Sequence, residues 1–302
     1  MTKQQYFWKR LKRDKYQYVM LIPAIVSTFV FSYLTMGGMI IAFQDFDIFR
    51  GFFGSEWVGF DNFVRIFTQR KFTVAVGNTL LLSVLNILIG FPAPIILALL
   101  INELELKRFK RVTQTISYLP HFLSWIAVVG LLYVLLGKEG IINDIRIAFG
   151  AEERVALLAQ QDLFIWILVL VNLWKETGWG TIVHLANLSS INPELFEAAS
   201  IDGATRMQKI RYITIPHMLP TITVLLIFQM GTLFASNFEL IYGLQNPFID
   251  FEVISTIVFQ TGIQNGDYSM ATAIGVAQSL IALLLVVFTN KLSKKLSGSG
   301  LI

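Results

Sequence analysis

Long apolar segments constrain this sequence more than any other feature. A bilayer hydrocarbon core of roughly 30 Å requires about 20 predominantly apolar residues per helix. Six segments meet or approach this length, at approximately 18–43, 73–101, 113–136, 162–187, 219–244 and 271–290. Hydrophobic residues make up 55% of the chain and charged residues only 15%, which is more apolar surface than a soluble fold buries. The sequence therefore predicts an all-α integral membrane protein with six transmembrane helices.

The distribution of Lys and Arg predicts the orientation of these helices. Segments on the N-terminal side of the membrane hold 16 of the 24 Lys and Arg residues, and segments on the opposite side hold 7. Because basic residues collect in cytoplasmic loops, both termini are expected in the cytoplasm, and the net charge of +4 does not require a nucleic-acid partner. We predict a cytoplasmic tail over 1–17, a single transmembrane domain over 18–290 and a cytoplasmic tail over 291–302.

Aromatic side chains crowd the segment between the first two predicted helices. Rings of this kind favour the headgroup region of a bilayer. Segment 44–72 carries Phe46, Phe49, Phe52, Phe53, Trp57 and Phe60, with acidic residues between them. We expect an ordered loop at the level of the headgroups rather than a surface that contacts a transported solute.

The sequence lacks the residue patterns typical of a metal site or a catalytic site. The chain contains no cysteine, so disulfides and thiolate metal sites are excluded. His121, His184 and His217 stand far apart and lack the short spacing of a zinc-binding helix motif. We expect no metal, cofactor or catalytic residue on this chain, and we expect His121 and His184 to be structural residues whose hydrogen bonds are satisfied.

The loop between the fourth and fifth predicted helices, 188–218, carries clear helix signals. Asn192 is a good N-cap, Pro193 suits the first helical position, and Gly203 can adopt the left-handed conformation that ends a helix. We predict a helix of about three turns that stops at a sharp bend. A second helical stretch is expected from Ala204 to Tyr212, ending at Pro216.

Small residues beside Leu195 and Phe196 in this loop permit close packing. The first helix of the loop therefore either fits a groove on another protein or lies on the membrane surface. The residues themselves leave both interpretations open.

The same loop resembles a known signature. Glu197-Ala198-Ala199, then Gly203 four residues on, then Ile213 and the pair Ile215-Pro216 resemble the EAA motif of ABC-importer permeases, with Ile215 where that family usually has Leu. Asp202 and Ala204 extend the likeness to maltose-permease-like sugar permeases. The stretches Tyr118–Phe122 and Met36–Gly38 are similar to the branch for complex oligosaccharides and polysaccharides, whose partner is a binding lipoprotein.

This resemblance implies a type I ABC importer permease fold and a set of partners. The helix in loop 188–218 would couple the permease to a cytoplasmic ATPase through Glu197, Ala198, Ala199, Asp202, Gly203, Ala204, Ile213 and Pro216. The expected assembly contains a second permease subunit as a heterodimer partner, two ATPases that bind ATP and Mg²⁺, and an extracellular sugar-binding lipoprotein. The sequence contains no Gly-x-x-x-x-Gly-Lys-Ser/Thr loop of its own. The chain would lie in a bacterial plasma membrane as a multi-pass transporter subunit, not an enzyme.

Polar and aromatic residues inside the predicted spans are candidates for the sugar path. Charged groups in spans usually face a cavity or a partner, and sugars bind aromatic faces and amide or carboxylate groups. The candidates are Trp125, Trp174, Lys175, Asn237 and Glu239. The alternative is that Lys175 pairs with Glu239, or that the two stabilise the permease dimer.

Two other classes of membrane protein fit the sequence less well. An ion-coupled secondary transporter would show inverted repeats or a relay of intramembrane carboxylates, and the sequence shows no evident repeat. An intramembrane protease would require a nucleophile and a base, and the Gly-x-Ser-x-Gly elbow is absent. The sequence therefore favours an ATP-driven importer of oligosaccharides or other sugars.

Overall fold

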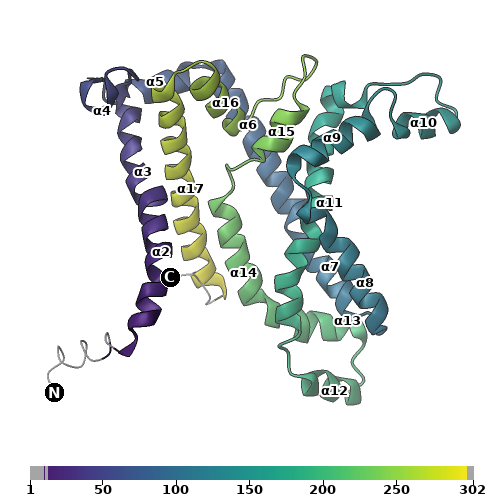
Figure 1. Ribbon diagram of the computed structural model, residues 1–302. Helices are drawn as coiled ribbons and strands as arrows, with labels where there is room; N and C mark the ends of the chain where they lie inside the picture. The colour runs from purple at the N-terminus through teal and green to yellow at the C-terminus, as the bar shows by residue number, and fades with distance from the viewer. Residues whose placement is uncertain (1–9, 11–12, 298–302) are drawn as a thin grey trace. The chain divides into compact units, whose positions relative to one another are not determined.

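The computed structural model describes residue 10 and residues 13–297 (Figure 1). The remaining residues include most of the predicted N-terminal tail and the end of the predicted C-terminal tail, which lie outside the described part. The chain divides into two compact units, Met1–Thr68 with Thr261–Val276, and Gln69–Gln260 with Ala277–Ile302. The predicted division into two tails and one transmembrane domain stays a prediction.

The first unit begins with a nearly continuous helix and ends in a small folded loop. The helical part comprises α2 (Lys15–Thr28), a π-helical turn (Phe29–Tyr33), α3 (Leu34–Met36) and a 3₁₀ stretch (Gly37–Phe43). The loop contains β1 (Gln44–Asp45), α4 (Gly51–Gly54), β2 (Glu56–Trp57) and α5 (Asp61–Thr68).

The folded loop of the first unit is organised by one buried amide. Strands β1 and β2 pair antiparallel, and the Asn62 side chain donates hydrogen bonds to the carbonyls of Ala42 (3.1 Å) and Gln44 (2.9 Å). The ring of Phe43 stacks on Trp57, with centroids 5.7 Å apart. The aromatic segment is therefore ordered, as its composition predicts.

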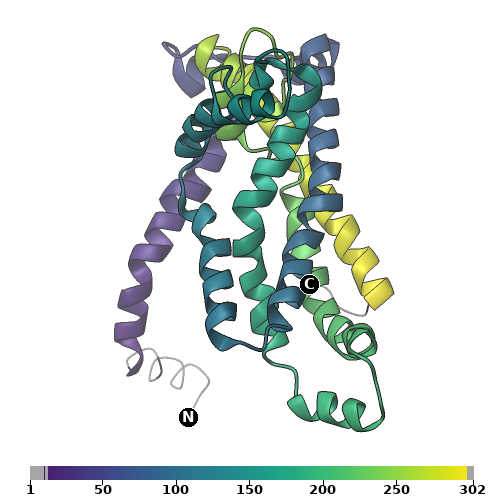
Figure 2. The same cartoon turned by 90° about the vertical axis from the view of Figure 1, so that its right-hand side faces the viewer.

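The second unit contains the remaining helices (Figures 1 and 2). Its first half has α6 (Arg70–Leu85), a π turn (Asn86–Gly90), α7 (Pro92–Asn102), α8 (Lys107–Tyr118), a 3₁₀ turn (Leu119–Phe122), α9 (Trp125–Leu136), α10 (Ile141–Ala148) and a 3₁₀ turn (Leu157–Ala159). Its second half has α11 (Gln161–Leu188), α12 (Pro193–Ile201), α13 (Arg206–Lys209), a π turn (Ile210–Thr214), α14 (Ile215–Gly231), α15 (Phe238–Leu244) and α16 (Ile254–Phe259). A π turn (Gln260–Gln264) and α17 (Tyr268–Ser297) run through both units.

Five helical stretches of the described chain are long and apolar enough to cross a membrane, so the predicted count of six is not confirmed. They are Lys15–Phe43, Arg70–Asn102, Trp125–Ala148, Arg206–Gly231 and Tyr268–Lys295. The predicted fourth span falls in α11, which is 28 residues long but carries Lys175 and Glu176 in its middle. These two charges lower the apolar character of α11 below that of the other five.

Two predicted spans are interrupted. The predicted span 113–136 breaks between the 3₁₀ turn and α9, where the Ser124 hydroxyl caps α9 by accepting from the Ala127 N–H at 3.2 Å. The predicted span 219–244 breaks between Gly231 and Phe238, where Asn237 caps α15 in the same way. Ser and Asn compete for backbone hydrogen bonds and favour helix starts over helix interiors. Hydropathy alone does not report that preference.

Glycines allow helices of the second unit to approach closely. A Cβ at Gly178 on α11 would overlap the backbone carbonyl of Ser117 on α8, and a Cβ at Gly180 would lie 2.8 Å from the Pro94 ring on α7. Small residues at helix crossings replace the hydrophobic driving force that membrane helices lack between one another. The packing of α11 against α7 and α8 therefore depends on these two positions.

Gly178→Ala is expected to destabilise the protein by about 1–3 kcal/mol, because overpacking at a backbone contact forces the two helices apart. The measurement is the thermal unfolding midpoint of the purified protein in detergent. Gly130→Ala is the matched control, since a Cβ at Gly130 meets nothing within 4 Å. Equal midpoints for the two variants would contradict the prediction.

Candidate functional site

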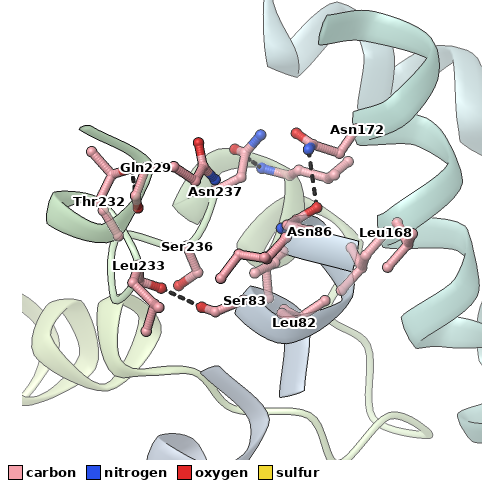
Figure 3. A pocket seen from close by; sticks show the side chains of 15 residues that line it. Leu82, Ser83, Asn86, Leu168, Asn172, Gln229, Thr232, Leu233, Ser236 and Asn237 are labelled. Carbon is pink, nitrogen blue, oxygen red and sulfur yellow. Dashed lines mark hydrogen bonds between the residues drawn. The ribbon is translucent and has the colours of Figure 1, made fainter. Parts of the chain in front are cut away.

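A cavity of about 220 Å³ lies between α6, α11 and the nonhelical link from α14 to α15 (Figure 3). Its polar lining consists of uncharged amides and hydroxyls, from Ser83, Asn86, Asn172, Gln229, Thr232, Ser236 and Asn237. The rest of the lining is apolar, including Leu82 and Leu168. We call it the asparagine cavity.

A π turn positions the amide of Asn86. The backbone carbonyl of Asn86 accepts from the N–H of Phe91 at 2.8 Å, five residues on. The Asn172 side chain on α11 donates to the Asn86 side-chain oxygen at 3.3 Å (Figure 3). Such π turns are rare and often occur at functional sites. The two amides come from positions 86 residues apart in the chain.

Side chains from other helices support the nonhelical link. The Ser83 hydroxyl donates to the carbonyl of Leu233 (Figure 3), and the Gln278 amide donates to the carbonyl of Phe234 at 3.1 Å. Asn237 accepts from the N–H of Leu240 at 3.2 Å. Nonhelical backbone at membrane depth is tolerated where it is buried in protein or lines a cavity. The link is therefore a built part of the cavity wall.

A second cavity, of about 460 Å³, continues the first. The two share Asn86, Asn172, Gln229 and Thr232, so a strip of uncharged polar groups runs along both. The second cavity is also lined by Glu176, Trp179 and Phe228 and by His184. We call it the histidine cavity.

Lys175 lies in a buried cluster beside the histidine cavity. Its ammonium donates to the backbone carbonyl of His121 at 2.8 Å, lies 3.6 Å from the Glu176 carboxylate, and stands 4.7 Å from the centroid of the Trp125 ring. The lysine side chain is only 4% exposed. The alternative pairing of Lys175 with Glu239 is wrong, because Glu176 is the adjacent residue and Glu239 is exposed in the first turn of α15.

His121, in the 3₁₀ turn before α9, and His184, in α11, differ in whether their hydrogen bonds are satisfied. His121 makes a hydrogen bond with Glu176 at 2.9 Å and stacks on Trp179, with ring centroids 4.4 Å apart and an interplanar angle of 4°. The expectation of a satisfied structural histidine holds for His121. It is wrong for His184, which is 3% exposed and whose Nδ1 has no hydrogen-bond partner among the described residues.

The structure separates the five residues expected in the sugar path. Asn237 lines the asparagine cavity, whereas Lys175 and Trp125 belong to the buried cluster. Trp174 and Glu239 are exposed and line neither cavity. Three further amides that line the asparagine cavity were not predicted from the sequence: Asn86, Asn172 and Gln229. The available signal was an amide inside an apolar run, which is costly in a membrane and therefore marks a functional position.

Helix α12 forms as the sequence predicts. The Asn192 side chain accepts from the N–H of Glu194 at 3.1 Å, and Pro193 occupies the first helical position. Gly203 has φ of 77°, and the following N–H of Ala204 donates to the Ala199 carbonyl at 2.8 Å. This left-handed residue ends the helix and turns the chain sharply.

The predicted stop at Pro216 is wrong. The Thr205 and Gln208 side chains form a capping box at the start of α13, and helical structure then continues through the π turn into α14. Pro216 occupies the first turn of α14. Proline has no N–H to donate. It is tolerated there because the hydrogen-bond pattern changes from a π turn to an α-helix at this point, so the missing bond does not interrupt the helix.

Helix α12 has one anchored side and one free side. Phe196 and Ile213 pack against the buried cluster that contains Leu188, Ile191 and Met218. Of the motif residues, Ala199, Ala204 and Ile213 are half-buried, and Glu197, Ala198, Asp202, Gly203 and Pro216 are exposed. Leu195 is 52% and Ile201 88% exposed. Figures 1 and 2 show α12 beyond the end of α11, opposite the end near α10. The helix thus presents apolar side chains at one tip of the second unit.

Comparisons with known proteins place the chain in a family. Residues 90–297 match the family described as binding-protein-dependent transport system inner membrane component. The chain is 40% identical over 295 residues to the polygalacturonan/rhamnogalacturonan transport system permease protein YteP of Bacillus subtilis (strain 168), covering 97% of this chain and 92% of that protein. It is also 40% identical over 294 residues to Protein LplB of the same organism, covering 96% and 92%.

Solved structures agree with this assignment. A chain of a bacterial ABC transporter involved in the import of the acidic polysaccharide alginate aligns with a TM-score of 0.87 and 41% identity, covering 96% of this chain and 99% of that one. An amino acid ABC transporter aligns with a TM-score of 0.52 at 14% identity, which shows the fold alone.

The protein belongs to the family of binding-protein-dependent transport system inner membrane components. It is a membrane-spanning permease subunit of an ABC importer with the type I fold, and neither an enzyme nor a secondary transporter.

Proposed function

We propose that this chain forms one half of the membrane path of an oligosaccharide importer, and that the asparagine cavity contacts the sugar. The observation that carries the proposal is the continuous strip of uncharged amides and hydroxyls that the two cavities share. Amides both donate and accept hydrogen bonds, which suits sugar hydroxyls, and they carry no charge that an importer would have to desolvate. The cargoes of the similar polygalacturonan/rhamnogalacturonan permease and of the similar alginate importer support the same class of cargo for this chain.

The proposed assembly follows the family. This chain would pair with a second, different permease subunit and with two cytoplasmic ATPases, which would bind ATP and Mg²⁺. An extracellular sugar-binding lipoprotein would deliver the cargo. One related alginate transporter is described in complex with an alginate pentasaccharide-bound periplasmic protein. The excess of Lys and Arg on the side of α12 supports cytoplasmic termini in a bacterial plasma membrane.

We place the contact with the ATPase on the free side of α12. Phe196 holds the helix to the core of the second unit, while Leu195, Glu197 and Ile201 face outward. The coupling segment would comprise Glu197, Ala198, Ala199, Asp202, Gly203, Ala204, Ile213 and Pro216. Closure of the two ATPases on ATP would then move α12 and, through it, α11 and α14. This biases the permease between inward-facing and outward-facing states.

A cargo panel tests the class of substrate. The complex of this chain with its partner permease, ATPases and binding protein is reconstituted in proteoliposomes. Tri- to hexasaccharides from polygalacturonan, alginate and starch are compared with dipeptides and histidine. At least one oligosaccharide series should stimulate ATP hydrolysis and be taken up. Stimulation by the peptides or by histidine, and by none of the saccharides, would overturn the proposal.

Asn172→Ala is expected to lower uptake of the active oligosaccharide up to about 10-fold, since a lost hydrogen bond contributes roughly 0.5–1.5 kcal/mol. Asn187→Ala is the matched control on the same helix. Asn187 donates to the Thr221 hydroxyl at 2.8 Å and lines neither cavity. ATP hydrolysis without sugar should be the same for both variants. A larger uptake defect in Asn187→Ala would contradict the placement of the path.

A further inference from the structure

The start of α8 concentrates positive charge. Four of its first five residues are basic, and the first turn carries no acidic residue. The N-terminal end of a helix is the positive end of its dipole, so cations are disfavoured there. The helix alone therefore gives no reason for these side chains. We call them the basic cluster: Lys107, Arg108, Lys110 and Arg111.

The fold of this chain leaves the basic cluster unpaired. All of its members are exposed except Lys110, which is half-buried. Within the part of the chain that the structure describes, none of the four side chains forms an ion pair or a hydrogen bond. The nearest acidic residue in the sequence, Glu105, pairs instead with Arg206 of α13 at 3.4 Å, at the end of the second unit that carries α12 (Figure 1). The cluster is thus available to an anion outside this chain.

An apolar stripe continues along the same helix. Its members are spaced three and four residues apart, which places them on one face of a helix. Each is more than half exposed, from 53% for Val112 to 65% for Ile116. Another face of α8 packs on α11, where Ser117 meets Gly178. The stripe therefore faces away from the helices of the second unit. It consists of Phe109, Val112, Ile116 and Leu119, the last in the 3₁₀ turn that follows α8.

The charge beside the stripe selects what covers this surface. Apolar side chains alone suit lipid tails and a second protein equally. A protein that covered the basic cluster would have to bring acidic groups to pair with it, because an unpaired buried charge is costly. A bilayer needs no such match. Lipid tails meet the stripe, and long basic side chains extend from it to the headgroup phosphates.

We propose that the start of α8 binds anionic phospholipid of the surrounding bilayer. Arg108 and Arg111 each directly precede a residue of the stripe, so their guanidinium groups lie beside the lipid tails that the stripe contacts. A guanidinium group binds phosphate through two parallel hydrogen bonds, and Lys107 adds a third exposed charge. The contact anchors α8 at the level of the headgroups and does not depend on which cargo the permease carries.

Native mass spectrometry of the complex of this chain with its partner permease and ATPases tests the lipid contact. The complex is released from bilayers of phosphatidylcholine and phosphatidylglycerol in equal amounts, and the wild type should retain more phosphatidylglycerol. In the variant Lys107→Gln, Arg108→Gln, Arg111→Gln this preference should fall about 10-fold or more, since each basic side chain near an anionic surface contributes about a five-fold gain in binding. An unchanged preference would overturn the proposal.

Lysines at the end of α17 provide the matched control. Lys291, Lys294 and Lys295 are exposed and lie at the negative end of their helix dipole, where cations are favoured. The variant Lys291→Gln, Lys294→Gln, Lys295→Gln removes the same charge and should change the lipid preference little. An equal loss in the two triple variants would show a general effect of charge and refute a site on α8.

The unfolding temperature separates a lipid site from a structural role. In phosphatidylcholine alone, the α8 triple variant should unfold at the wild-type temperature or slightly above it, because it relieves the unfavourable charges at the positive end of the helix dipole. Phosphatidylglycerol should then stabilise the wild type more than the variant. A lower unfolding temperature of the variant in phosphatidylcholine, or loss of the second permease or the ATPases from the purified complex, would show that the cluster serves protein contacts instead.

Discussion

Gly203→Val is expected to reduce sugar-stimulated ATP hydrolysis and uptake about 10-fold or more, although the permease still inserts and assembles. Gly203 adopts φ of 77° at the end of α12, where a β-branched residue is a genuine outlier. A left-handed conformation costs an ordinary residue about 1–2 kcal/mol, and a factor of ten corresponds to about 1.4 kcal/mol. Since a Cβ at this position meets nothing within 4 Å, the effect is on backbone conformation alone.

Gly203→Asn is the matched variant for this prediction. Asparagine visits the left-handed region more readily than other residues with a side chain, so it should preserve the turn between α12 and α13 and retain most of the coupling. ATP hydrolysis and uptake are measured on the same proteoliposomes, and assembly is checked by copurification of the ATPases. The placement of the coupling segment fails if Gly203→Val couples normally, or if both variants are equally inactive.

Lys175→Met is expected to destabilise the permease by about 1–3 kcal/mol, the usual cost of leaving a buried acceptor without its donor. The substitution leaves the His121 carbonyl without its 2.8 Å donor and removes the cation from Glu176 and from the Trp125 ring. The thermal unfolding midpoint in detergent measures the loss. Lys138→Met removes an exposed lysine and should leave the midpoint unchanged.

A double substitution tests the physical cause. Lys175→Met with Glu176→Gln removes both charges, so the uncompensated carboxylate disappears and part of the lost stability should return. Coupling between adjacent charged residues is measured by a double-mutant cycle. Additive losses would mean that Lys175 stabilises the protein through the His121 carbonyl and the Trp125 ring, and not through the ion pair.

In loop 188–218 the structure matches the sequence-based prediction at the first helix and departs from it at Pro216. Local chemistry specified the start and the end of α12, because an Asn cap, a Pro at the first position and a Gly in the left-handed region act within a few residues. The same local reasoning was wrong at Pro216. A proline stops a helix only if the chain cannot accommodate the missing hydrogen bond, and a π turn before α14 provides that accommodation.

Of the asparagines that line the asparagine cavity, the sequence pattern predicted only one. Asn237 was found because it stands beside a charged residue in an apolar run, but Asn86 and Asn172 were overlooked as single amides. Their pairing joins the π turn after α6 to α11, and Ser83 on α6 holds the link after α14 that closes the cavity. Trp174 and Trp179 have the same residue type on the same helix, and only the rotation of α11 decides that Trp179 lines the histidine cavity.

The sequence by itself determined the class of this protein, the ABC-importer family and the helix that carries the EAA motif, because hydropathy, helix capping and motif spacing are local properties of the chain. The tertiary structure alone decided that Lys175 is paired with Glu176 and that Nδ1 of His184 has no hydrogen-bond partner among the described residues. It also decided that amides from the π turn after α6, from α11 and from α14 line one continuous strip. These features depend on how helices distant in sequence rotate and approach each other. That arrangement is set by close packing at positions such as Gly178, which no local pattern encodes.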